Sequence, residues 1–204
     1  MKLHFALLFG LLWLAAVGRG EDADRFDKIK ERLSRAGCAR FQFLSVIESD
    51  VFDRSDTMTG DACISADGRY LVNLGMDQYL YDLRCLFSYS GDNNQVTIEH
   101  VSPEDTFGDE ISFLTRLDEL YETYPSMTNL CYRLVKRKPQ RQNIPDSMIL
   151  CIRADTLKLD RIEYYDLNEE LNRILFLRQE ISAACDDSLF IPIYPDSVEY
   201  IRLD

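Results

Sequence analysis

Three apolar runs of strand length follow one another between Ser147 and Arg178, and no other stretch restricts the possible folds as strongly. The runs are Met148–Ile152, Leu157–Tyr165 and Arg173–Leu177, and they are rich in β-branched and aromatic residues. The turn-prone clusters Arg-Ala-Asp and Asp-Leu-Asn-Glu-Glu separate them. The sequence therefore predicts a three-stranded antiparallel meander.

The alternation within this meander slips by one residue. Leu157 and Leu159 share one face of the second strand, whereas Ile162 and Tyr164 share the other. A slip near Asp160–Arg161 is typical of a β-bulge, and bulges bend sheets. Because several strands also carry apolar residues on both faces, we expect a curved sheet whose inner face is covered.

The rest of the chain continues the strand pattern. Strand-length segments with short turns between them precede and follow the meander, which favours hairpin topology and gives a total of about ten or eleven strands. These further segments are Ala39–Phe52, Thr59–Ser65, Gly68–Leu74, Gln78–Asp82, Cys85–Ser90, Gln95–Val101, Tyr132–Lys136 and Val198–Leu203, with the proline-containing run Ile191–Pro195 fitting an edge.

Two segments have helical periodicity. The first spans Asp24–Gly37, and its apolar residues recur every three or four positions until Gly37 ends it. The second begins at the capping sequence Ser102-Pro-Glu-Asp and runs for about 20 residues to Pro125. Its apolar stripe is wide and aromatic, so this helix faces either an ordinary core or a binding site; the stripe comprises Phe107, Ile111, Leu114, Leu117, Tyr121 and Tyr124.

The first 20 residues have the pattern of a secretory signal peptide. Lys2 and His4 precede the apolar run Phe5–Val17, and the small residues Gly18 and Gly20 follow it. The apolar run is shorter than the about 20 residues that a membrane-spanning helix needs. We therefore expect residues 1–20 to be removed and residues 21–204 to form a single domain.

The net charge argues against nucleic acid as a partner. The chain carries 23 Lys and Arg against 35 Asp and Glu, a formal charge of −12, and removing Lys2 and Arg19 with the signal peptide makes it −14. An acidic surface of this kind repels nucleic acid and anionic membranes. The one basic stretch, Lys136–Asn143, is expected to be a solvated hairpin loop or, alternatively, a docking patch for an acidic partner.

All six cysteines lie in the predicted mature chain, an even number that favours up to three disulfides in an oxidising compartment. The candidates are Cys38, Cys63, Cys85, Cys131, Cys151 and Cys185, and their spacing leaves all fifteen pairings open. No C-x-x-C motif exists, and His100 is the single mature histidine, so we expect no metal site. The sequence contains no Gly-x-Ser-x-Gly motif, and we propose no catalytic residues and no cofactor. Of the functional classes considered, an enzyme is the least favoured.

Several short motifs together resemble a known family. They are Thr59-Gly60, Gly68-Arg-Tyr70, Leu86-Phe-Ser-Tyr-Ser-Gly-Asp-Asn-Asn-Gln-Val-Thr97, Asp155-Thr-Leu-Lys-Leu-Asp-Arg-Ile-Glu-Tyr-Tyr-Asp-Leu-Asn168, Asp187-Ser-Leu-Phe190 and Pro195. In this order they are similar to the outer-membrane lipoprotein carrier (LolA-like) family, and they extend over nearly the whole mature chain.

The resemblance implies an α+β fold, an incomplete antiparallel β-barrel of about eleven strands with helices covering an apolar concave face. It also implies a monomeric periplasmic carrier that receives acylated lipoproteins, or another lipid, from an inner-membrane lipoprotein-releasing transporter and passes them to an outer-membrane acceptor. On this basis the lipid-binding candidates are Phe43, Tyr70, Val72 and Phe87 on the sheet and Ile111, Leu114, Leu117 and Tyr121 on the second helix.

One departure from the family pattern bears on this interpretation. The family usually carries a Pro-Gly-x-x-Arg-Trp segment, whose Arg is thought to tie the lid to the sheet, but here Leu71 and Val72 stand at the Arg and Trp positions. Disulfides could then do part of the work of that Arg. The alternative function is a periplasmic regulatory or interaction domain that keeps the scaffold and senses or binds a lipid or protein partner without transport.

Overall fold

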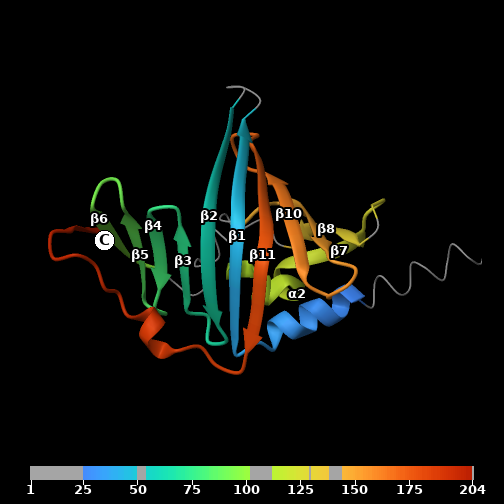
Figure 1. Ribbon diagram of the computed structural model, residues 1–204, viewed down its shortest axis with the longest axis horizontal. Helices are drawn as coiled ribbons and strands as arrows, with labels where there is room; N and C mark the ends of the chain where they lie inside the picture. The colour runs from blue at the N-terminus through green and yellow to red at the C-terminus, as the bar shows by residue number, and fades with distance from the viewer. Residues whose placement is uncertain (1–24, 50–53, 102–111, 129, 138–143, 204) are drawn as a thin grey trace, which may run out of the picture.

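The computed structural model describes residues 25–49, 54–101, 112–128, 130–137 and 144–203. They form one open sheet of twelve strands in the order β12-β6-β5-β4-β3-β2-β1-β11-β10-β9-β8-β7 (Figure 1). The strands are β1 (Cys38–Ser49), β2 (Arg54–Ser65), β3 (Tyr70–Leu74), β4 (Asp77–Tyr81), β5 (Cys85–Ser90), β6 (Gln95–His100), β7 (Tyr121–Pro125), β8 (Cys131–Lys136), β9 (Ser147–Ile152), β10 (Leu159–Tyr165), β11 (Leu171–Ser182) and β12 (Glu199–Leu203).

Within β1–β6 and within β7–β11, strands that follow one another in the sequence pair as antiparallel neighbours, as the hairpin prediction required. Two pairings are of a different kind. β1 pairs antiparallel with β11, from Cys38 opposite Ser182 to Glu48 opposite Leu171, and β12 pairs parallel with β6. The long β1–β11 pairing joins the hairpins of the first half to the predicted meander, so β1 lies at the centre of the sheet.

Two register shifts bend the sheet. The predicted bulge near Asp160 is confirmed, because the β9–β10 register shifts between Leu159 and Arg161. A second shift lies in the β1–β11 pairing, where Gln42 faces Arg178 but Phe43 faces Phe176. The strands turn from upright in β1 to nearly horizontal in β7 and β8, so the sheet curls around helix α2 (Leu117–Leu120) (Figure 1).

The strand order forces the chain to cross the sheet twice. β6 and β7 lie towards opposite edges, so the chain between them must pass over one face; its described part is the 3₁₀ turn η1 (Ser112–Arg116) followed by α2. Residues 183–198, which contain the 3₁₀ turn η2 (Asp187–Phe190), must likewise cross from central β11 to β12 at the edge. We call the face covered by η1, α2 and the N-terminal helix (residues 25–34) the inner face, and the opposite face the outer face.

The prediction of a long second helix is wrong over its described part. Only η1 and the four residues of α2 are helical, and residues 121–125 form β7, which pairs with β8. Tyr121 is 1% exposed whereas Tyr124 is 48% exposed, a difference that a strand produces between positions three apart and a single helical stripe does not. Pairing with the edge of β8 overrides the local pattern. Phe107 and Ile111 lie outside the described residues.

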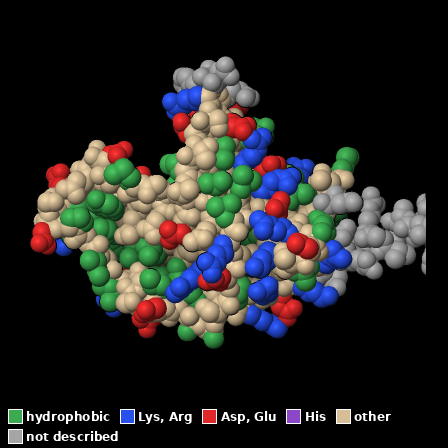
Figure 2. Space-filling view, in the orientation of Figure 1, with side chains coloured by type: hydrophobic (Ala, Val, Ile, Leu, Met, Phe, Trp, Pro, Cys, Tyr) green, Lys and Arg blue, Asp and Glu red, His purple; other side chains and the backbone are tan. Residues whose placement is uncertain are grey.

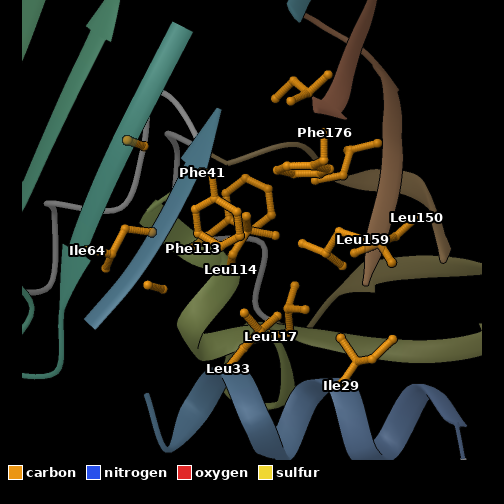
Figure 3. Close-up of a cluster of buried hydrophobic side chains, with 14 of the residues drawn as sticks. Ile29, Leu33, Phe41, Ile64, Phe113, Leu114, Leu117, Leu150, Leu159 and Phe176 are labelled. Carbon is orange, nitrogen blue, oxygen red and sulfur yellow. The ribbon is translucent and has the colours of Figure 1, made fainter. Parts of the chain in front are cut away.

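One hydrophobic core fills the space between the inner face and its cover (Figure 3). Phe41 and Phe176 from adjacent central strands meet Phe113 and Leu114 of η1, while Ile29 and Leu33 approach from the N-terminal helix. The predicted amphipathic stripe of that helix is therefore confirmed. Burying a side chain of this size is worth about 1.5–3 kcal/mol, so this single layer of contacts holds the cover to the sheet.

Candidate functional site

The inner face brings together most of the predicted lipid-binding residues. Of the eight candidates, six belong to the one core cluster and none of these six is more than 7% exposed. The sheet contributes four of them, and η1 and α2, which cross the inner face, contribute the other two. They are Phe43, Tyr70, Val72, Leu114, Leu117 and Tyr121.

The structure places Phe87 elsewhere. Phe87 pairs with Leu80, and Leu80 pairs with Leu71, so all three lie on the outer face. Its neighbour Leu86 pairs with Tyr81 and packs against the inner core instead. Because both residues at this point of β5 are large and apolar, the sequence pattern did not distinguish the two faces. Ile111, the remaining candidate, lies outside the described residues.

The cover contributes aromatic residues that the candidate set omitted. Phe26 of the N-terminal helix stacks on Tyr132 of β8 with ring centroids 4.2 Å apart. Phe113 of η1 meets Tyr121 edge-on at 6.0 Å. Such pairs contribute about 0.5–1.5 kcal/mol beyond their burial. The helical spacing of Phe26 was the sequence signal for its burial, whereas Phe113 lay beside the predicted stripe.

An ion pair joins the two parts of the cover. Lys30 of the N-terminal helix contacts Asp118 of α2 at 2.6 Å and Asp27 of its own helix at 2.9 Å. Burial alone would lower the pKa of Lys30, but hydrogen bonds to Asp118 and Asp27 outweigh it and the pKa is raised. Because the Asp118 side chain is 62% exposed, we expect the pair to contribute no more than about 1 kcal/mol.

Arg137 anchors α2 to the end of β8. Its backbone N–H donates to the carbonyl of Leu120 at 2.9 Å, and its Nε donates to the carbonyls of Asp118 and Tyr121 at 3.1 Å each. These carbonyls lie at the C-terminal end of α2, where a cation is favourable. Arg137 lies in the predicted basic loop and is exposed, as expected of a solvated residue, but its side chain also hydrogen-bonds to α2.

In the family pattern an Arg ties the lid to the sheet, and we expected disulfides to replace it in part. The structure does not bear out this expectation. Leu71 lies on the outer face and Val72 is fully buried on the inner face, so neither reaches the cover as a latch. The two disulfides, Cys38–Cys185 and Cys131–Cys151, do not join the cover to the sheet either. Among the described residues, Arg137, just past the end of β8, hydrogen-bonds to the backbone of α2.

Two of the expected disulfides are present, and they fit an exported protein. Cys131 and Cys151 face each other on neighbouring strands β8 and β9. Cys63 on β2 and Cys85 on β5 remain thiols. Two strands separate β2 from β5, a distance of about 14 Å at 4.8 Å per strand, which is too far for a disulfide between them.

The outer face carries a hollow of about 420 Å³ over the central strands. Charged and polar residues of β1, β2, β3 and β11 line it together with apolar ones; the lining comprises Arg40, Phe41, Gln42, Asp61, Ala62, Cys63, Leu71, Asn73, Arg178, Glu180 and Leu189. Figure 2 shows that Lys and Arg side chains gather towards the β8–β11 half of the molecule rather than the β4–β6 half. The mixed charge and polarity of this hollow do not suit an acyl chain, which leaves the inner face as the candidate lipid site.

No helix among the described residues is long and apolar enough to cross a bilayer.

No protein-family model matches the sequence, and a search of curated proteins found no match. Solved structures are similar in fold. An uncharacterized conserved protein from Thermus thermophilus has a TM-score of 0.50 at 11% identity, covering 91% of this chain and 99% of that protein. The LolA superfamily protein NE2245 from Nitrosomonas europaea has a TM-score of 0.47 at 9% identity, covering 81% and 97%.

The MucA/MucB complex from Pseudomonas aeruginosa is a more distant match, with a TM-score of 0.41 at 16% identity over 84% of this chain and 61% of that one. At these identities the similarity concerns the fold and not the activity. The expected architecture of an open curved sheet with helical segments on its concave face is present, with twelve strands instead of about eleven. The chain therefore has the open-sheet architecture that the sequence resemblance implied, and it shares its fold with the T. thermophilus protein.

Proposed function

We propose that this protein is an exported lipid carrier that takes an acyl chain against its inner face when the cover moves aside. One observation carries the proposal: the cover meets the sheet through buried apolar side chains, and its Lys30–Asp118 ion pair joins the two cover segments to each other. A ligand that replaces the apolar contacts of the cover can therefore displace it without leaving that ion pair broken. Arg137 at the end of β8 provides a point about which α2 can turn.

The energies on the two sides of this exchange are of similar size. Roughly fourteen buried methylenes of an acyl chain are worth about 11 kcal/mol at about 0.8 kcal/mol each. Exposing five large cover side chains costs about 1.5–3 kcal/mol each, or about 7–15 kcal/mol; these are Phe26, Ile29, Leu33, Leu114 and Leu117. Binding is therefore close to balanced by displacement of the cover, which lets a carrier release its load as well as take it up.

The setting proposed for this activity is the periplasm. The disulfides support export, and the resemblance to the lipoprotein carriers supports acylated lipoproteins as the cargo. By the same resemblance, the protein would act as a monomer between an inner-membrane lipoprotein-releasing transporter and an outer-membrane acceptor.

The direct test is to purify the protein gently from the cell that exports it and to examine it by native mass spectrometry with lipid extraction. A co-purifying acylated lipoprotein or acyl lipid, in about equal amount to the protein, is expected. A protein that is lipid-free and also fails to bind a fluorescent acyl probe would overturn the carrier proposal.

A variant tests whether the two cover segments must move together. Asp118→Ala removes the ion pair that joins α2 to the N-terminal helix, so either segment can move aside without the other, and we expect a fluorescent fatty acid to bind up to about fivefold more tightly, as a pair worth up to about 1 kcal/mol implies. Asp92→Ala, at an exposed acid in the turn between β5 and β6, is the matched control and should leave the affinity unchanged. Equal affinities for both variants and the wild type would show that opening of the cover does not limit binding.

A second function has one observation in its favour. Six of the seven described candidates are packed together and buried, so the inner face is filled by the protein's own side chains. A regulatory or interaction domain that binds a protein partner through its surface needs no open cavity, so a filled inner face is compatible with that function. The failure of both lipid tests, together with a stable protein complex recovered from the same cell, would favour that function.

A further inference from the structure

Three cysteine sulfurs form a compact group on the outer face. Cys38 at the start of β1 is bonded to Cys185, which lies just before η2. The thiol of Cys63 on β2 lies 3.4 Å from the Sγ of Cys38 and 3.3 Å from the Sγ of Cys185. Phe190, Leu71 and Leu189 pack around the group. The thiol lies beside the S–S bond, almost equally far from its two atoms, so a rotation of these side chains that brings the three sulfurs into line precedes any exchange.

We propose that Cys63 and the Cys38–Cys185 disulfide form a thiol–disulfide exchange site, through which the C-terminal segment can move its covalent anchor from β1 to β2. Cys63 is here the attacking nucleophile. The disulfide is the acceptor, and residues 183–198 are the segment whose anchor changes.

The step needs no external oxidant or reductant. The thiolate of Cys63 attacks the Sγ of Cys185, the Cys63–Cys185 bond forms, and the Cys38–Cys185 bond breaks. Cys38 leaves as a thiolate and takes up the proton that Cys63 released. One disulfide and one thiol are present before and after the step. Attack on Cys38 instead would give a Cys38–Cys63 bond and release the C-terminal segment from its anchor.

Noncovalent contacts can hold the segment in place while the bond changes. The Arg69 guanidinium pairs with Asp187 of η2 at 2.7 Å and lies 4.7 Å from the centre of the Phe190 ring. Cys185 and η2 therefore stay near β2 when the bond to Cys38 opens. Cys63 also lines the outer-face hollow, which gives solvent and base a route to its proton.

The surroundings of Cys63 determine what fraction of its thiol is ionised, and the exchange rate depends on that fraction. Burial raises the pKa of the Cys63 thiol, and the guanidinium of Arg40 opposes this effect in part. The other charged groups of the hollow and its rim are Asp61 from the same strand, Arg178 and Glu180 from β11, and Asp186 before η2, whereas β3 and η2 present Leu71 and Leu189. Because the thiol is mostly protonated at neutral pH, we expect the exchange rate to rise about tenfold per pH unit up to the raised pKa.

The test maps the disulfides of the whole mature protein. The oxidised protein is incubated at pH 7 and pH 9 without reductant, quenched in acid, alkylated with N-ethylmaleimide under denaturing conditions and analysed by peptide mass spectrometry. A time-dependent appearance of Cys63–Cys185 or Cys38–Cys63 bonds, with alkylation spreading from Cys63 to Cys38 or Cys185, is the expected result. The Cys131–Cys151 bond and the thiol of Cys85 are internal controls and should stay as they are.

Two variants locate the reaction. In Cys38→Ser the two remaining sulfurs should form a Cys63–Cys185 bond in air, and Cys63→Ser should leave Cys38–Cys185 as the one bond of the group at either pH. A wild-type protein that keeps Cys38–Cys185 alone, with all alkylation of the group on Cys63 after prolonged incubation at pH 9, would overturn the proposal even if the variants fail to fold.

Discussion

Tyr121 is buried and Tyr194 is half-buried, and their hydroxyl groups differ in hydrogen bonding. The Tyr121 hydroxyl donates to the carbonyl of Pro145 at 3.0 Å. The Tyr194 hydroxyl is buried and has no hydrogen-bond partner among the described residues, while its ring lies 5.5 Å from that of Tyr89 on the outer face. Burial raises the pKa of Tyr194 to about 12. An unpaired buried hydroxyl costs about 1–3 kcal/mol, whereas a paired one contributes about 1 kcal/mol.

Phe substitutions at the two tyrosines should therefore act in opposite directions. Tyr194→Phe is expected to leave the free energy of unfolding unchanged or raise it by about 1 kcal/mol, and Tyr121→Phe to lower it by about 1 kcal/mol. Urea unfolding followed by circular dichroism measures both. A loss at Tyr194 equal to that at Tyr121 would mean that the Tyr194 hydroxyl is paired.

The raised pKa of Tyr194 also predicts a pH dependence. The folded protein holds the proton of the Tyr194 hydroxyl more tightly than the unfolded chain, whose tyrosines titrate near pH 10. The contribution of this proton to the free energy of unfolding is therefore complete below pH 10 and is lost as the pH rises towards about 12. The wild type should lose stability more steeply than Tyr194→Phe between pH 10 and 12. Parallel curves for the two proteins would contradict the assignment.

Gly60 allows a close approach within the sheet. A Cβ at Gly60 would lie 2.3 Å from Cζ of the buried Phe43 ring on the neighbouring strand. Gly60→Ala should force this ring out of place and lower the free energy of unfolding by about 1–3 kcal/mol. Thr59→Ala, at the exposed neighbouring position, is the control and should cost less than about 0.5 kcal/mol. Adding Phe43→Leu to Gly60→Ala should give a loss smaller than the sum of the two single changes.

At the scale of elements, α2 is the cover segment that polar contacts hold most directly. Arg137→Ala removes two hydrogen bonds from its side chain to the carbonyls of Asp118 and Tyr121. We expect faster amide hydrogen exchange in residues 112–121 and a loss of about 1–2 kcal/mol in unfolding free energy. Arg133→Ala, at an exposed position of β8, is the matched control. Unchanged exchange in residues 112–121 would show that apolar packing alone fixes α2.

Most strands could be predicted from the sequence because their local signals agree with the tertiary structure. Gln95–Val101 was predicted where β6 ends at His100, and the bulge near Asp160 was visible as a broken alternation. β7 could not be predicted, because its apolar spacing also fits a helix and only β8 alongside it decides between them. The same limit explains why Phe87 was assigned to the wrong face. Leu86 and Phe87 are adjacent and both apolar, so the sequence pattern does not show which of the two points to the inner face.

At the scale of the whole molecule, the two disulfides close loops of very different length. Cys38 and Cys185 are separated by 147 residues, and Cys131 and Cys151 by 20. The chain-entropy relation gives about 5 kcal/mol of stabilisation for the longer loop and about 3 kcal/mol for the shorter one. The double variant Cys38→Ser/Cys185→Ser should therefore lose more stability than Cys131→Ser/Cys151→Ser. Thermal unfolding of both without reductant measures this, and the reverse order would show that native-state packing outweighs loop closure.

The sequence by itself determined the strand-rich class, the bend in the meander, the apolar stripe of the N-terminal helix and the cysteine content, because each depends on neighbours within a few positions. Only the tertiary structure decided the β1–β11 pairing, the cysteine partners, the strand at residues 121–125 and the face on which each candidate lies. These features depend on contacts between residues far apart in the chain, such as Cys38 with Cys185 and Arg137 with Asp118. Local periodicity carries no information about which distant segment supplies the other half of such a contact.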